Sequence, residues 1–238
     1  ETKKKDERIK QIEASFGQVL GAASGVKQAT TDEILDLDWL RSGMKGSKLA
    51  LVEKRLVVLD SDADRLAIVD PAKKSGEVIA GKADLGKTKL MATYPGKITV
   101  LSDKGIIECS ISSIQCSIIA EAKEIDTAID MKMFAGNIYL LTQNDIFRYQ
   151  VTDGGYGGKQ KWLSDADSGL SQSLNMAIDA YVWVLEAQSS KLEIRKFIRG
   201  VRETFEILDL DKPFGLSGII YTDPDVEMLY ILDRDNGR

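Results

Sequence analysis

The chain has 238 residues, enough for one large domain or two ordinary ones, and its 43% hydrophobic content can build a substantial core. The formal net charge of −5 disfavours a nucleic-acid partner, because such sites carry a basic field. The chain contains no histidine, which excludes Ser–His–Asp and Cys–His catalysis and imidazole metal sites from this sequence. No apolar run approaches the roughly 20 residues that cross a bilayer.

Residues 1–28 are predicted to form an amphipathic α-helix. Its apolar residues follow the alternating spacing of three and four that defines an a/d seam: Ile9, Ile12, Phe16, Val19, Ala23 and Val26. Two interpretations stay open, a helix packed on the next domain and the end of a longer coiled-coil stalk. Residues 29–32 are interpreted as a linker. Because the chain begins with Glu1 rather than Met, we expect further sequence upstream, which could include a membrane anchor.

The hexapeptide EILDLD occurs twice, at Glu33–Asp38 and at Glu206–Asp211. A second pair of similar segments, Leu56–Arg65 and Leu229–Arg238, has the same offset. Two matches with one offset indicate that the chain returns to an equivalent structural position after a whole number of repeats.

A five-residue apolar core recurs at intervals of 40 to 47 residues. Its copies are LVVLD (Leu56–Asp60), ITVLS (Ile98–Ser102), IYLLT (Ile138–Thr142), VWVLE (Val182–Glu186) and LYILD (Leu229–Asp233). Each core is followed by a polar turn, the first four by a further strand pattern, and another strand pattern precedes each core. Four short strands per repeat are typical of a β-propeller, so residues 33–238 are predicted to be all-β, with about five four-stranded blades and the last one incomplete.

The strand pattern [LIV]-x-[VIL]-L-[DSTE] with its polar turn resembles the NHL-like and TolB-like propeller repeats across residues 33–238. The resemblance implies the fold, and propellers of this kind include binding modules as well as enzymes.

The repeat register predicts that Glu33–Asp38 is an outer strand and that residues 33–40 complete the last blade and close the ring. The chain ends at Arg238, the counterpart of Arg65, before a third strand of that blade. We therefore expect the sequence to be a fragment of a larger protein.

The turns that follow the recurring cores share one end of a propeller, and acidic residues gather in them. We interpret this acidic loop face as a candidate partner-binding surface, formed by Asp60, Asp62, Asp64, Asp103, Asp145, Glu186, Asp233 and Asp235. The alternation of Asp60, Asp62 and Asp64 also fits a loose Ca²⁺ site, although Arg65 and Pro71 replace the glycine and glutamate of an EF-hand loop. The alternative is that these carboxylates hydrogen-bond their own turns.

A complete G-x-x-x-x-G-K-[ST] pattern covers Gly81, Gly86, Lys87 and Thr88. A phosphate-binding loop must open a helix, but too few residues remain before Pro95 and the register places a strand there. The pattern is interpreted as an inter-blade loop, and no nucleotide site is predicted.

Two further features concern loops. The glycine-rich segment Asp153–Lys159 is predicted to be an outer hairpin in which Tyr156 could contact a ligand.

If Ser112–Ser113 forms a tight hairpin, Cys109 and Cys116 face each other. A disulfide and two buried thiols are both open, and the thiols are favoured.

These observations predict a non-catalytic binding, sensor or scaffold domain that engages a protein or glycan partner through the acidic loop face, without a cofactor. The alternative is a propeller enzyme of lactonase or lyase type that depends on a divalent cation, for which Asp130 and Asn175 are the candidate ligands. The sequence does not determine the compartment, but an extension at both ends favours an extracytoplasmic or membrane-associated location.

Overall fold

The computed structural model describes residues 7–12, 15–16, 31–167, 169–189, 191–207, 212–226 and 228–237. The chain divides into two compact units, Glu1–Ile34 and Leu35–Arg238. In the first unit residues 7–12 and 15–16 are helical, and Ile9, Ile12 and Phe16 are exposed. This confirms a short N-terminal helix. The rest of the predicted a/d seam lies outside the described residues, so the helical residues that are described do not support a coiled coil.

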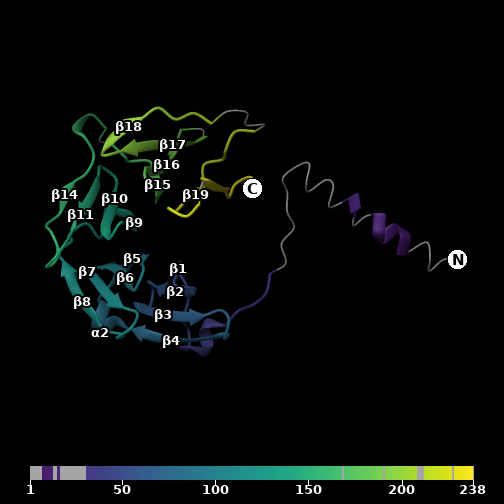
Figure 1. Cartoon of the computed structure of the whole chain (residues 1–238), viewed down its shortest axis with the longest axis horizontal. Helices are drawn as coiled ribbons and strands as arrows, with labels where there is room; N and C mark the ends of the chain where they lie inside the picture. The colour runs from purple at the N-terminus through teal and green to yellow at the C-terminus, as the bar shows by residue number, and fades with distance from the viewer. Residues whose placement is uncertain are drawn as a thin grey trace. The chain divides into compact units, whose positions relative to one another are not determined.

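The second unit is a succession of antiparallel sheets in which strands follow one another in chain order (Figure 1). Blade 1 contains β1 (Lys48–Val52), β2 (Arg55–Asp60), β3 (Arg65–Asp70) and β4 (Ser75–Ala80). A short helix, α2 (Lys82–Leu85), leads to blade 2, which contains β5 (Thr88–Tyr94), β6 (Lys97–Ser102), β7 (Gly105–Ser110) and β8 (Cys116–Ala120).

Blade 3 contains β9 (Ala128–Phe134), β10 (Asn137–Thr142), β11 (Ile146–Tyr149) and β14 (Gln160–Lys161), with the small hairpin β12 (Val151–Thr152) and β13 (Gly155–Tyr156) inserted before its last strand. Blade 4 contains β15 (Ser173–Ile178), β16 (Val182–Gln188), β17 (Lys191–Ile198) and β18 (Val201–Glu203). Two strands of a fifth blade follow, β19 (Gly218–Tyr221) and β20 (Tyr230–Asp233). Four complete blades and a partial fifth among the described residues confirm the predicted all-β architecture.

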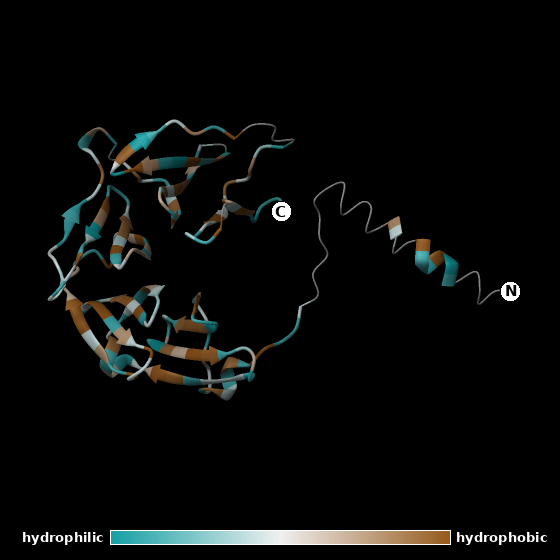
Figure 2. Ribbon diagram, in the orientation of Figure 1, coloured by the Kyte–Doolittle hydropathy of each residue, from teal (hydrophilic) through white to brown (hydrophobic). Residues whose placement is uncertain are grey.

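The core lies between the blades. Val57, Leu59 and Ile68 of blade 1 pack against Ile98 and Val100 of blade 2, and comparable clusters join each later pair of blades. The central strands are buried on both faces and therefore consist of nearly continuous apolar residues, as the recurring cores predicted. Figure 2 shows these hydrophobic stretches along the strands.

The prediction of a strand at Glu33–Asp38 is wrong. Residues 33–36 have no regular structure and η1 (Leu37–Trp39) is a 3₁₀ turn. The side chain of Asp36 accepts a hydrogen bond from the Asp38 amide (3.0 Å), and Asp38 accepts one from the Gly43 amide (2.7 Å). Such local bonds compete with a sheet ladder, which explains why the alternating pattern does not become a strand.

Residues 35–40 cover the face of blade 1 that points away from blade 2. Leu35, Leu37 and Leu40, with Met44, pack against a cluster on that face formed by Val58, Ala67 and Val69. Within the part of the chain that the structure describes, none of residues 33–40 adds a strand to the last blade. In the second EILDLD copy, Glu206 and Ile207 also lie outside any strand, since β18 ends at Glu203, and residues 208–211 are outside the described residues.

The fifth blade has one packed face and one bare face. Ile220 and Ile231 pack on blade 4. On the opposite face Ile219 pairs with Leu232 and Tyr221 with Tyr230, and all four side chains are exposed.

Cys109 and Cys116 form a disulfide between β7 and β8, where they are direct cross-strand partners. The predicted pairing is thus confirmed, and the favoured alternative of two free thiols is wrong. Among the described residues no helix is long and apolar enough to span a membrane.

Candidate functional site

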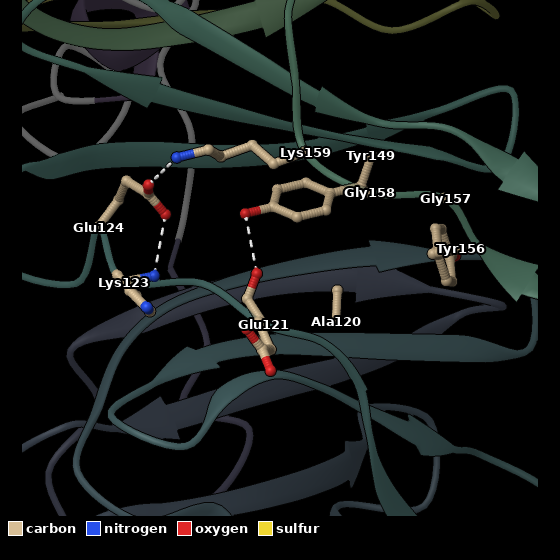
Figure 3. Close-up of a pocket in the computed structure, with 9 residues that line it drawn as sticks. All are labelled: Ala120, Glu121, Lys123, Glu124, Tyr149, Tyr156, Gly157, Gly158 and Lys159. Atoms are coloured by element: carbon tan, nitrogen blue, oxygen red, sulfur yellow. Dashed lines mark hydrogen bonds and ion pairs between the residues drawn. The ribbon is translucent and has the colours of Figure 1, made fainter.

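A pocket of about 520 Å³ lies between the connection that follows β8 and the glycine-rich segment that follows β13 (Figure 3). Its volume falls within the range of small-molecule sites. The lining residues are Ala120, Glu121, Lys123, Glu124, Tyr149, Tyr156, Gly157, Gly158 and Lys159. We call this the Tyr156 pocket.

Tyr149, at the end of β11, is a buried part of this lining. Its hydroxyl donates a hydrogen bond to the main-chain oxygen of Glu121 (3.3 Å), which Figure 3 shows as a dashed line. Burial, followed by the negative charge of Glu124, raises the pKa of the Tyr149 phenol. The phenol therefore stays neutral and holds the connection between blades 2 and 3 against β11.

Tyr156 lines the pocket from the inserted hairpin. Its hydroxyl donates to Glu108 Oε2 (3.5 Å), and Lys97 Nζ lies 3.0 Å from the same oxygen. Burial and then the charge of Glu108 raise the pKa of Tyr156 to about 12. The half-buried ring thus presents a neutral aromatic surface whose orientation is fixed by blade 2.

The charged residues of the pocket balance one another. Lys159 forms an ion pair with Glu124, whose side chain is largely buried, and Lys159 Nζ also lies 4.5 Å from the centroid of the Phe147 ring. Lys123 and Glu121 are exposed. The pocket therefore offers donors and acceptors without a net charge, which suits a ligand that carries both kinds of group.

The predicted acidic loop face is mostly used by the protein itself. Five of its eight members are buried: Asp60, Asp64, Asp145, Glu186 and Asp233. Asp60 accepts from the Lys45 amide (2.9 Å), Asp64 accepts from the Thr88 amide (2.7 Å), and Glu186 pairs with Arg195 (2.7 Å). These contacts reach other segments of the chain. Asp60 also accepts from the Asp62 and Ala63 amides, and Asp233 accepts from the Asn236 amide, as expected if the carboxylates hydrogen-bond their own turns.

Several of these carboxylates hold the chain where it enters an innermost strand. Asp103 accepts from the Lys87 amide just before β5 (2.8 Å). Asp233 and Asp235 accept from the amides of residues 215–217 just before β19. Asp145 accepts from the Ile146 amide (2.8 Å) and pairs with Lys161 (3.2 Å). Asp62, Asp103 and Asp235 are the exposed members of the face.

The candidate metal ligands do not converge. Asp60 and Asp64 bind different amides, as given above, and within the described ranges no group of three or more His, Cys, Asp or Glu is placed to hold a metal ion. Asp130 Oδ2 accepts from the Met176 amide (3.0 Å), while Asn175 Oδ1 accepts from the Ile220 amide (3.2 Å). Each is the third residue of an innermost strand and bonds to the innermost strand of the next blade.

The residues of the G-x-x-x-x-G-K-[ST] pattern lie in the connection between blades 1 and 2. Thr88 is the first residue of strand β5 and donates its amide and its hydroxyl to Asp64. The strand at Thr88–Tyr94 is the element that the repeat register predicts. The short helix α2 within the pattern was not predicted.

No family model and no curated protein sequence matches this chain. The solved structures that are similar to it include an auxiliary nutrient binding protein from Bacteroides ovatus (11% identity, TM-score 0.53, 67% of this chain and 46% of that chain), a nidogen/laminin complex (14%, 0.54, 81% and 78%) and TolB from Acinetobacter baumannii (14%, 0.52, 79% and 51%). These neighbours are β-propeller proteins, and the second unit shares their succession of antiparallel sheets.

The fold is a β-propeller.

The propeller resembles the TolB-like and NHL-like group, as the strand pattern implied, and at these identities the likeness shows the fold alone. The chain spans 46% of the length of the Bacteroides ovatus protein and of a Bacteroides thetaiotaomicron protein of unknown function.

Sequence reasoning identified only one side of the Tyr156 pocket, the glycine-rich segment with Tyr156. It missed Tyr149, Glu121 and Glu124, because Tyr149 closes an ordinary apolar strand and the glutamates lie in an inter-blade connection. The sequence feature that pointed to this pocket was the glycine-rich hairpin inserted between the third and fourth strands of blade 3.

Proposed function

We propose that this propeller is a non-catalytic binding domain and that its ligand, a protein segment or a glycan, occupies the Tyr156 pocket. The observation that carries the proposal is the pocket itself, in which a fixed neutral tyrosine ring lies beside a balanced set of charges. Pockets of this size with a few oriented polar groups are typical binding sites.

Two further observations support a binding role outside the cytoplasm. The Cys109–Cys116 disulfide favours an oxidising compartment. Two structures that share the fold are named as a nutrient binding protein and as a protein complex, which makes a binding role the natural comparison. The acidic loop face enters the proposal only through Asp62, Asp103 and Asp235, since the other members are buried against the chain.

The proposal is tested with the purified chain on a short-peptide library and a glycan array. We expect specific hits that weaken at least tenfold in the double variant Tyr156→Ala/Lys159→Ala. Thr152→Ala is the matched control, because it lies on the same inserted hairpin, is exposed and does not line the pocket. The proposal fails if no hit weakens in the double variant, and an absence of hits in both libraries would refute the binding role.

A further inference from the structure

A second hollow of about 720 Å³ lies on the first blade, and it shares no residue with the Tyr156 pocket. It is lined by Arg65, Gly76 and Val78 of β3 and β4. Trp39 and Arg41, from the segment around η1, and Lys82 of α2 also line it.

The hollow follows from the packing of blade 1. Leu37, the first residue of the 3₁₀ turn, and Leu40, which follows the turn, pack on the outer face of the blade. On the neighbouring strand Gly76 has no side chain to fill the space, and a Cβ there would lie 2.7 Å from the Ile68 carbonyl oxygen. Glycine is therefore required, and the surface beside the turn stays concave.

Trp39 is exposed at 83% in the wall of this hollow, although tryptophan is mostly buried in folded proteins. Trp183 is buried and Trp162 is half-buried. Packing gives no reason for an exposed indole at this position, whereas a flat apolar ring beside a concave surface is a common element of a binding site.

The charge of the hollow is positive, although the chain as a whole carries −5. Arg41, Arg65 and Lys82 line it with Glu77 as the one acidic side chain. Arg65 donates to the Ser42 main-chain oxygen (3.2 Å), which orients its guanidinium. Lys82 Nζ lies 3.4 Å from Asp64 and its side chain is 77% exposed. The Arg41 main chain bonds within its own turn, but among the described residues its guanidinium group has no hydrogen bond or ion pair. The guanidinium groups of Arg41 and Arg65 thus keep N–H donors for an anion, and the ammonium group of Lys82, although paired with Asp64, adds positive charge.

We propose that this hollow binds an acidic sugar, a hexuronic acid unit of a polysaccharide, with the apolar face of the sugar ring on Trp39 and the carboxylate paired with Arg41 and Arg65. A neutral sugar would not need the cations, and a small inorganic anion would not need the exposed ring. Guanidinium groups pair with carboxylates through two parallel hydrogen bonds, which explains the use of arginine beside the ring. This site is additional to the Tyr156 pocket and does not depend on it.

The test is calorimetric titration of the full chain with trigalacturonate, with maltotriose as the neutral counterpart and sodium sulfate as the simple anion. We expect binding of trigalacturonate, at least tenfold weaker binding of maltotriose, and an affinity that falls as salt is raised. Trigalacturonate should also shield Trp39 from quenching by acrylamide, a neutral quencher.

Trp39→Ala and Arg41→Ala are each expected to weaken binding of trigalacturonate at least tenfold. Arg65→Lys keeps the positive charge but loses the planar fork, and it tests the pairing geometry without removing the cation. Arg234→Ala, an exposed arginine on the fifth blade, is the matched control. The Tyr156→Ala/Lys159→Ala variant should bind trigalacturonate as the parent chain does, which separates this site from the proposed function.

Any one of three results would overturn the proposal. They are equal affinity for maltotriose, unchanged binding of trigalacturonate by Trp39→Ala, and full displacement of trigalacturonate by sulfate at matched ionic strength. The first two results would remove the roles of the carboxylate and the ring, and the third would reduce the hollow to a simple anion site.

Discussion

Asp130 joins blades 3 and 4, and its replacement by alanine should destabilise the propeller measurably. Asp130 Oδ2 accepts a hydrogen bond from the Met176 amide (3.0 Å). Met176 is buried, so its amide would lose its acceptor in the alanine variant. A hydrogen bond to a charged group contributes about 1.5–3 kcal/mol. The Lys132 pair at 3.0 Å is half-exposed and adds no more than about 1 kcal/mol. We therefore expect Asp130→Ala to lower the free energy of unfolding by about 2–4 kcal/mol.

Two variants separate the acceptor from the charge. Asp130→Asn keeps an oxygen acceptor for the Met176 amide and should cost only about 1 kcal/mol. Asn175→Ala removes the equivalent neutral bond to the Ile220 amide, whose contribution is also about 1 kcal/mol. The expected order of destabilisation is Asp130→Ala first, with Asp130→Asn and Asn175→Ala well below it.

The assay is urea unfolding followed by tryptophan fluorescence, combined with hydrogen exchange at the Met176 amide. Because repeat proteins can unfold in parts, the exchange measurement reports the inter-blade bond directly. The reasoning is refuted if Asp130→Ala lies within about 0.5 kcal/mol of the parent chain, the scatter of ordinary surface substitutions. It also fails if Asp130→Asn is as damaging as Asp130→Ala, since the charge would then dominate over the acceptor.

Three further predictions concern other parts of the propeller. Arg195→Met leaves the buried Glu186 carboxylate without its ion partner and should cost about 3–5 kcal/mol in urea unfolding, whereas the double variant with Glu186→Gln should recover part of that loss. Cys116→Ala opens a disulfide that links residues seven apart and should cost about 2 kcal/mol; dithiothreitol should reproduce this loss in the parent chain and leave the variant unchanged. The folded chain keeps the Tyr156 proton to about pH 12, whereas an unperturbed tyrosine titrates at 10.0, so the contribution of Tyr156 to stability is complete below pH 10 and is lost as the pH rises through 12. Tyr156→Phe should therefore make the fall in stability between these pH values shallower, and an unchanged pH profile would contradict the assigned pKa.

The blades were predictable because their signal is local. Each recurring core is long enough to be a strand buried on both faces, and each is bounded by a polar turn, so propensity and periodicity point to the same structure. The positions of β2, β6 and β10 follow directly from this agreement.

The segment Glu33–Asp38 shows where local reasoning fails. Its alternation of leucine and aspartate is typical of a strand, but the carboxylates of Asp36 and Asp38 bind nearby amides, and the leucines find burial on the open face of blade 1. The outcome depends on which surface is left uncovered in the folded domain, and a sequence window does not contain that information.

Five of the eight acidic residues proved to be buried for a related reason. Their clustering at one end of the blades was predicted. However, the sequence does not distinguish a carboxylate that is exposed to a binding partner from one that accepts a hydrogen bond from a backbone amide of the same chain. Asp60 and Asp64 reach amides that are 15 and 24 residues away along the chain. Both candidate hollows likewise combine segments from different elements, which only the folded arrangement brings together.

The bare face of β19 and β20 has a practical consequence for solution experiments. This face presents a contiguous hydrophobic patch, formed by Ile219, Tyr221, Tyr230 and Leu232. Exposed hydrophobic patches promote self-association. Salts that are excluded from protein surfaces, sulfate among them, strengthen such contacts. Concentrated stocks are therefore best kept in chloride buffers with low sulfate, and light scattering across a dilution series should precede every titration described above.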